Sequence, residues 1–251
     1  MQLWRSAGMT WAILVFLCAA LCGLAGCGQN TPGRMEWIQP LTTATPRVGT
    51  VYCIRGWQGV FSWGIDEMSE QLKAQGITAY VFMPEQYPEM AKTMVERYKN
   101  SPNHEPICFI GHSRGVDSSI IIARELDQAG VKVDLIVALD SVDEDVVPKN
   151  VRECRNYWMP GFLYGTNILR GIPLKAQAGS IGTVYNLRLD SEEGKEFHEP
   201  LMNHVDMDKK PKLQKHIVEQ CKQVCVERAK WNAQLPPTPG MPAAPATRPA
   251  R

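Results

Sequence analysis

The feature of this chain most suited to chemistry is a serine between two glycines, in the pentapeptide Gly-His-Ser-Arg-Gly at residues 111–115. An apolar run, residues 106–110, precedes the pentapeptide, and a helix-like run, residues 116–129, follows it. In this strand–turn–helix context the pattern G-x-S-x-G exposes the serine hydroxyl above a sheet edge. The glycines let neighbouring elements pass close to the turn. The sequence therefore predicts that Ser113 is a nucleophile, whereas without this context it would be an idle serine in a Gly-rich turn.

A serine nucleophile needs a histidine to take its proton and a carboxylate to orient that histidine. Both partners are expected after the serine in chain order, on loops that follow strands. Asp140 directly follows the apolar run at residues 133–139 and is the predicted acid. Asp190 also follows an apolar run and is the alternative, although little chain separates it from His204.

Three histidines follow the serine and could act as the base. His204 lies between the last predicted strand and the last predicted helix, so it is the predicted base. His198 lies in the same loop and is the alternative, whereas His216 lies within the predicted helix. His112 stands inside the pentapeptide and is interpreted as structural.

Two backbone N–H groups are expected to stabilise the oxyanion that forms when Ser113 attacks a carbonyl. One belongs to Arg114, the residue after the nucleophile, and the other to Trp57, in the loop at residues 55–59. Gly56 allows a sharp turn in that loop. The alternative interpretation is an ordinary strand–helix connection.

Taken in order, the Gly-rich loop, the G-x-S-x-G pentapeptide, Asp140 after a strand and then His204 resemble the α/β-hydrolase superfamily across most of residues 48–231. An acid on the strand after the elbow helix resembles the thioesterase and lipase branches. The resemblance implies a serine hydrolase that cleaves a carboxylic ester or thioester through an acyl-enzyme. The chain departs from the family pattern because the first two strands of the full fold are missing and no separate strand stands between Asp190 and His204. These departures bear on the identity of the acid.

Composition narrows the partners of such a protein. The net charge is +1 and no long Lys/Arg run occurs, which argues against nucleic acid. No cysteine and histidine spacing typical of zinc occurs, and the chemistry needs no metal or organic cofactor. The predicted partner is therefore a small acyl ester or thioester. Two alternatives are an envelope lipoprotein that keeps the fold as a non-catalytic binding module and, less directly, a serine peptidase.

Strand-like and helix-like segments alternate through the chain. Because the strand-like runs are almost continuously apolar, they are expected to be buried on both faces, as in a parallel sheet covered by helices. The prediction is an α/β-hydrolase-like, doubly wound, mostly parallel sheet of reduced size. Strands are predicted at residues 48–54, 77–83, 107–111, 131–139 and 181–189, with helices at 65–75, 90–98, 116–129 and from 211. The stretch at residues 146–180, apolar with interspersed glycines, predicts either a lid over the site or a helix and loop packed on the sheet.

The chain begins with features of an export signal. Residues 1–26 contain an apolar core that is short for a membrane span. Leu-Ala-Gly-Cys at residues 24–27 resembles the lipobox of bacterial lipoproteins, which implies that Cys27 is lipidated and holds the protein on a membrane of the bacterial cell envelope. Gly28 stands where an inner-membrane retention signal has Asp, which favours the outer membrane. Residues 27–47 are then predicted to be a tether, and the Pro/Ala-rich residues 232–251 a disordered tail.

The remaining cysteines have two interpretations. Cys53 and Cys108 lie in apolar runs and are expected to be small buried hydrophobes. In an oxidising compartment Cys154 could pair with Cys221 or Cys225. Alternatively, Cys221 and Cys225, one helical turn apart, line one face of a helix without pairing.

Overall fold

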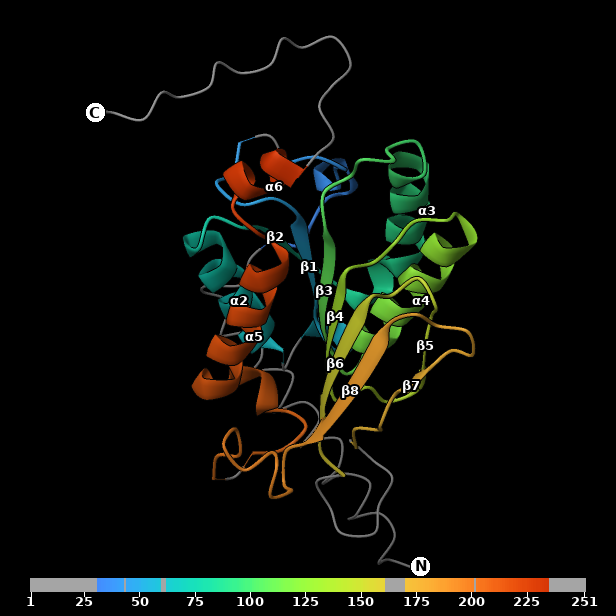
Figure 1. The fold of residues 1–251 in the computed structure, drawn as a ribbon. Helices are drawn as coiled ribbons and strands as arrows, with labels where there is room; N and C mark the ends of the chain where they lie inside the picture. Colours follow the sequence, from blue (N-terminus) through green and yellow to red (C-terminus); the bar gives the residue numbers. More distant parts are fainter. Residues whose placement is uncertain (1–30, 43, 60–61, 161–169, 201, 235–251) are drawn as a thin grey trace, which may run out of the picture.

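A parallel sheet of six strands forms the centre of the protein (Figure 1). The computed structural model describes residues 31–42, 44–59, 62–160, 170–200 and 202–234. The strands run side by side in the order β2-β1-β3-β4-β6-β8, and each neighbouring pair is parallel. Their bounds are β1 Thr50–Ile54, β2 Thr78–Phe82, β3 Ile107–His112, β4 Leu135–Leu139, β6 Glu153–Trp158 and β8 Thr183–Arg188.

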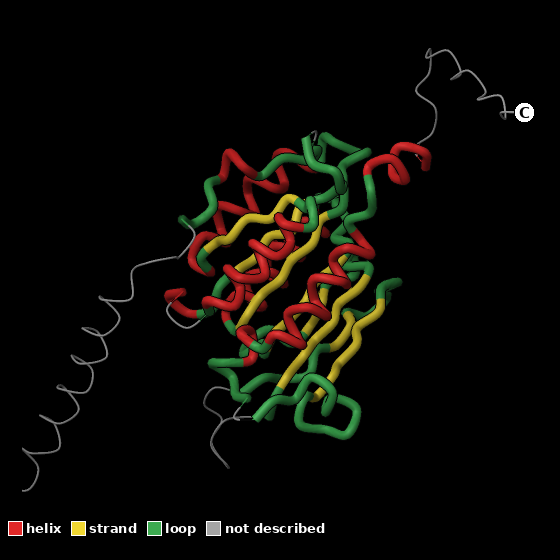
Figure 2. Tube along the Cα trace, turned by 90° about the vertical axis from the view of Figure 1, so that its left-hand side faces the viewer, coloured by secondary structure: helices red, strands yellow, loops and turns green. Residues whose placement is uncertain are grey.

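Helices cover both faces of this sheet, as Figures 1 and 2 show from two directions. One face packs against α3 and α4, and the other against α2 and α5. The strands β1, β3 and β4 are buried along their whole length, which explains their apolar sequences. The predicted doubly wound, mostly parallel sheet is therefore confirmed. The helices are α2 Trp63–Ala74, α3 Tyr87–Tyr98, α4 Arg114–Gln128, α5 Pro211–Val224 and α6 Arg228–Gln234.

Short elements complete the described fold. Strands β5 Val146–Val147 and β7 Lys175–Ala176 form a separate parallel pair. The 3₁₀ turns are η1 Met35–Trp37, η2 Trp57–Gly59, η3 Pro84–Gln86 and η4 Met207–Lys209. None of the helices in the described ranges has the length and apolar character needed to cross a bilayer.

Strand β6 corrects the sequence analysis, which assigned its residues to a lid or to a packed helix and loop. The strand lies inside the sheet, between β4 and β8. It carries no apolar run, because Arg155 and Asn156 interrupt it. Asn156 is nevertheless buried, since its amide donates hydrogen bonds to the Ile172 carbonyl and the Asn186 side chain, both at 2.8 Å. Residues 161–169 of the predicted lid lie outside the described residues.

The predicted tether also needs correction where the structure describes it, from residue 31 on. Ile38 is fully buried, and the Gly33 N–H donates to the Val81 carbonyl of β2. Arg97 of α3 donates to the carbonyls of Met35 and Ile38. These residues therefore belong to the folded domain rather than to a spacer. At the other end, residues 232–234, which were predicted to lie in the tail, complete α6.

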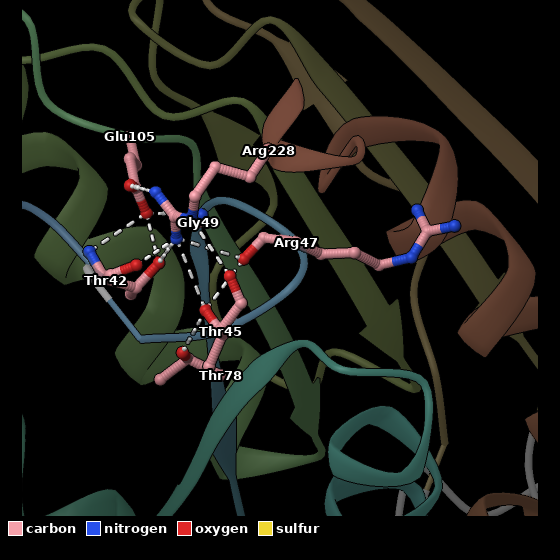
Figure 3. A network of polar contacts seen from close by, with 7 residues as sticks. All are labelled: Thr42, Thr45, Arg47, Gly49, Thr78, Glu105 and Arg228. Carbon is pink, nitrogen blue, oxygen red and sulfur yellow. Dashed lines mark hydrogen bonds and ion pairs between the residues drawn. The ribbon is translucent and has the colours of Figure 1, made fainter. Parts of the chain in front are cut away.

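A buried carboxylate joins these two ends of the domain (Figure 3). Glu105 accepts hydrogen bonds from the backbone N–H groups of Thr42 and Gly49 and from the Arg228 guanidinium. Burial alone would raise the pKa of Glu105, but these hydrogen bonds outweigh it and lower that pKa below its ordinary value. Glu105 and Gly49 precede β3 and β1. The network therefore lies at the amino ends of these strands, whereas Ser113 lies at the carboxyl end of β3.

The sheet separates the cysteines that were considered for pairing. Cys154 lies in the core beneath α3 and α4, whereas Cys221 and Cys225 lie in the core on the α5 side. Among the described residues all five cysteines are buried and free. The Sγ atom of Cys225 is 4.0 Å from that of Cys108 on β3. The structure thus corrects the suggested pairing of Cys154 and agrees with an unpaired Cys221 on α5 and an unpaired Cys225 directly after that helix.

Candidate active site

The carboxyl ends of the central strands bring the predicted nucleophile and acid together. Ser113 follows β3 and Asp140 follows β4, and the two strands are direct neighbours in the sheet. His204 reaches the same edge from the loop between β8 and α5. All three side chains are buried or nearly so. The fold therefore places them where parallel α/β sheets usually bind ligands.

Ser113 stands at a sharp turn between β3 and α4. Its φ of 54° and ψ of −122° lie outside the regions that an L-residue ordinarily adopts. A Cβ at Gly111 would lie 2.6 Å from backbone atoms of Gly115, and one at Gly115 would lie 2.2 Å from the Ile54 carbonyl. The two glycines are thus required by close backbone contacts. The Ser113 N–H donates to the Leu139 carbonyl at 2.8 Å, which ties the turn to β4.

A chain of hydrogen bonds links the three side chains. Ser113 Oγ lies 3.1 Å from His204 Nε2, and His204 Nδ1 lies 3.1 Å from Asp140 Oδ2. The carboxylate accepts the proton on Nδ1, so Nε2 is free to accept the serine proton. This arrangement activates a serine for attack on a carbonyl carbon.

Asp140 is held from its second oxygen as well. Oδ1 accepts the Met159 N–H at 2.7 Å, just beyond the end of β6. Complete burial raises the pKa of Asp140 above its ordinary value, although the hydrogen bond and charge of His204 and the Met159 N–H act in the opposite direction. With both oxygens engaged, the carboxylate has one orientation toward His204.

The alternative acid and bases lie elsewhere. Asp190 pairs with Arg188 through two bonds of 2.6 and 2.9 Å, and the Arg188 hydrogen bond lowers the pKa of Asp190. His198 is exposed. His216 lies within α5, with its ring 4.6 Å from that of Phe197. The structure thus brings Asp140 and His204, not these alternatives, to Ser113.

A cleft of about 650 Å³ opens beside Ser113. Both residues predicted to supply oxyanion N–H groups, Trp57 and Arg114, line it together with Ser113. Trp57 belongs to η2, directly after Gly56, and the residue is 62% exposed. The remaining lining residues are Pro84, Glu85, Tyr87, Ser118 and Val142.

Three residues around this site were not anticipated from the sequence. Met159 contributes a backbone N–H that no sequence motif marks, and Gly171 packs against Asp140. Ser62 precedes α2, where a serine ordinarily predicts an N-cap. Its hydroxyl instead contacts His112, and no side-chain cap is formed.

No protein-family model matches the chain, and no curated protein matches it. Several solved structures resemble it, including the following three. The product of the gene lin2722 from Listeria innocua is 11% identical, covers 70% of this chain and 94% of its own, and gives a TM-score of 0.46. The thioesterase domain SrfTE, which cyclises the lipopeptide antibiotic surfactin, is 12% identical over 69% and 91%, with a TM-score of 0.39. A cutinase-like protein from Cryptococcus sp. is 12% identical over 74% and 98%, with a TM-score of 0.42. Likenesses at this level assign no function to the chain.

Proposed function

We propose that the protein is a serine hydrolase that cleaves a carboxylic ester or thioester. The observation that carries the proposal is the hydrogen-bonded series Ser113, His204 and Asp140, of which Ser113 lines a cleft. A serine whose Oγ shares a proton with a carboxylate-oriented imidazole is poised for nucleophilic attack.

The proposed reaction has two halves. His204 Nε2 removes the Ser113 proton as Oγ forms a bond to the carbonyl carbon, and the Trp57 and Arg114 N–H groups stabilise the oxyanion. Each such donor supplies roughly 3–4 kcal/mol in comparable sites. The alcohol or thiol then leaves with the proton from His204, and an acyl-Ser113 ester remains. Water, deprotonated by His204, then attacks the acyl carbon, the bond from that carbon to Ser113 Oγ breaks as His204 returns the proton to Oγ, and the carboxylic acid leaves.

The cleft favours a substrate with an apolar acyl part. Its volume falls within the roughly 300–1,000 Å³ of small-molecule sites. Trp57, Pro84, Tyr87 and Val142 supply apolar surface beside the serine. The substrate class proposed is therefore an acyl ester or thioester rather than a charged polymer.

The test compares wild type with Ser113→Ala on p-nitrophenyl esters of increasing acyl length and with a fluorophosphonate probe. We expect Ser113→Ala to lose turnover by on the order of a million-fold and to lose labelling, without loss of fold. Ser101→Ala, in the turn after α3, is the matched control and should stay active. If folded wild type neither labels nor turns over any ester, the protein is a non-catalytic binding module instead.

The same proposal includes a lipid anchor at Cys27, which lies outside the described residues. Its support is the lipobox-like residues 24–27 after an apolar run. Cys27→Ser should move the protein from the membrane fraction of a bacterial envelope to the soluble fraction, or block processing. Mass spectrometry of the mature N-terminus checks this directly, and an unmodified terminus at another residue would refute the anchor.

A further inference from the structure

Three buried hydrogen bonds connect the two loops on either side of the nucleophile. The Gly56 N–H donates to Ser62 Oγ at 2.8 Å, and Ser62 Oγ lies 2.8 Å from His112 Nδ1. His112 Nε2 lies 2.7 Å from the backbone carbonyl of His204. These bonds therefore run from the loop that holds Trp57, across the residue before Ser113, to the loop that holds His204.

The chemistry of the groups fixes where each proton lies. A carbonyl oxygen only accepts, so His112 Nε2 must carry a proton. Burial, with the nearby His204 as the second cause, lowers the pKa of His112 to about 3, so the ring is neutral near pH 7 and Nδ1 is bare. Nδ1 therefore accepts the Ser62 hydroxyl proton, and the Ser62 oxygen is left to accept the Gly56 N–H. Each hydrogen bond in the connection therefore has one defined donor and one defined acceptor.

Close packing supports the same connection. A Cβ on Gly56 would lie 2.6 Å from Ser62 Oγ and 3.2 Å from His112 Nδ1. The rings of His112 and His204 lie 5.1 Å apart between centroids. Independently, a Cβ on Gly64 would lie 2.1 Å from the Asp208 carbonyl, so the start of α2 abuts the segment that follows His204. The contacts leave the two loops little freedom to move separately.

We propose that Ser62 and His112 are positioning residues that hold the oxyanion loop and the His204 loop in register with Ser113. The inference rests on the proposed function, since it concerns how that reaction is supported. Neither side chain exchanges a proton with substrate. Misplacement of a reacting group by about 1 Å can cost on the order of a hundredfold in rate, so the loss of this support should appear in kcat.

Three variants separate the two arms of the connection. Ser62→Ala removes the hydroxyl that joins Gly56 to His112. His112→Asn keeps an acceptor near the Nδ1 position but loses the donor to His204, whereas His112→Gln keeps a donor near Nε2 but loses the acceptor for Ser62. The controls are Ser69→Ala, a buried serine within helix α2, which follows Ser62, and His104→Asn, which precedes the other end of β3.

The readouts are kcat and KM on p-nitrophenyl butyrate, and hydrogen–deuterium exchange of residues 55–62 and 202–208. We expect Ser62→Ala and His112→Asn to lower kcat by roughly ten- to a hundredfold with KM nearly unchanged, and both controls to stay within about twofold. His112→Asn should speed exchange mainly at residues 202–208, and His112→Gln mainly at residues 55–62.

Unchanged kcat in folded Ser62→Ala and His112→Asn proteins would overturn the inference and leave the proposed function standing. Equal acceleration of exchange across the whole domain would show a general packing role and overturn it as well. If wild type itself neither turns over esters nor labels at Ser113, the proposed function fails, and this inference fails with it. Should His112→Asn not fold, Ser62→Ala alone decides, because removing one hydroxyl leaves the smallest void.

Discussion

Replacement of Asp140 by Asn tests the proposed acid with a side chain of nearly the same shape. In the native site, Oδ1 accepts the Met159 N–H and Oδ2 accepts the proton on His204 Nδ1. In Asp140→Asn only one terminal atom can accept. Because the Met159 N–H can only donate, the amide oxygen must face Met159 and the amide nitrogen must face His204.

This orientation reverses the histidine. The amide N–H donates to His204 Nδ1, which places the imidazole proton on Nε2, where it faces Ser113 and cannot accept the serine proton. We expect kcat to fall roughly ten-thousand-fold, equivalent to about 5 kcal/mol of transition-state stabilisation. Complete burial already disfavours a charge at Asp140, so the neutral variant should fold with little loss of stability.

The assay measures kcat on p-nitrophenyl butyrate, with circular dichroism and thermal melting as checks of the fold. Asp190→Asn is the matched control, since Asp190 engages Arg188 at the end of β8 and should be dispensable. An active Asp140→Asn variant beside an inactive Asp190→Asn variant would refute the reasoning and move the acid to Asp190.

Two further predictions concern the surroundings of the site. Gly171→Ala should lower kcat by on the order of a hundredfold, because the new Cβ would lie 2.0 Å from Asp140 Oδ1. Urea unfolding of this variant should show a loss of roughly 1–3 kcal/mol in the free energy of unfolding. Unchanged kcat would mean that the backbone around Gly171 moves away from Asp140 without cost. Burial raises the pKa of Asp208 to about 7 from 3.8, so the folded state binds more protons than the unfolded state between these values and its stability falls as pH rises through them. Asp208→Asn should therefore gain more stability at pH 8 than at pH 4, measured by urea unfolding, and an equal gain at both would contradict the titration.

The sharp turn at Ser113 could be predicted because its signal is local. Strand, glycine, serine, glycine and helix occur in sequence, and the glycines at positions 111 and 115 meet backbone atoms that a side chain would strike. No local sequence signal separates Asp140 from Asp190, since both follow a strand. The choice depends on strand order: β4 neighbours β3, whereas β8 lies at the edge of the sheet.

The segment at residues 31–47 was harder to interpret, because its attachment depends on partners far along the chain. Its polar residues suggested a spacer, yet Thr42 and Thr45 bond to Glu105 and Arg228. Hydrogen bonds between residues that are far apart in the chain leave no periodic pattern in the sequence around either partner. Only the folded structure reveals them.

Strand β6 is a second element that sequence patterns do not reveal, and it bears directly on the site. The Nδ2 amide of its buried Asn156 donates to the Ile172 carbonyl and to Asn186 Oδ1, so the strand tolerates a polar residue that breaks the apolar run expected of a sheet interior. Just beyond that strand stands the Met159 N–H, the group that turns Asp140 toward His204 and decides how an Asn would sit in its place. The strand that sequence patterns conceal therefore leads directly to the group that orients the proposed acid. Asp140 could be predicted from its place after a strand, but its contact with the Met159 N–H could not.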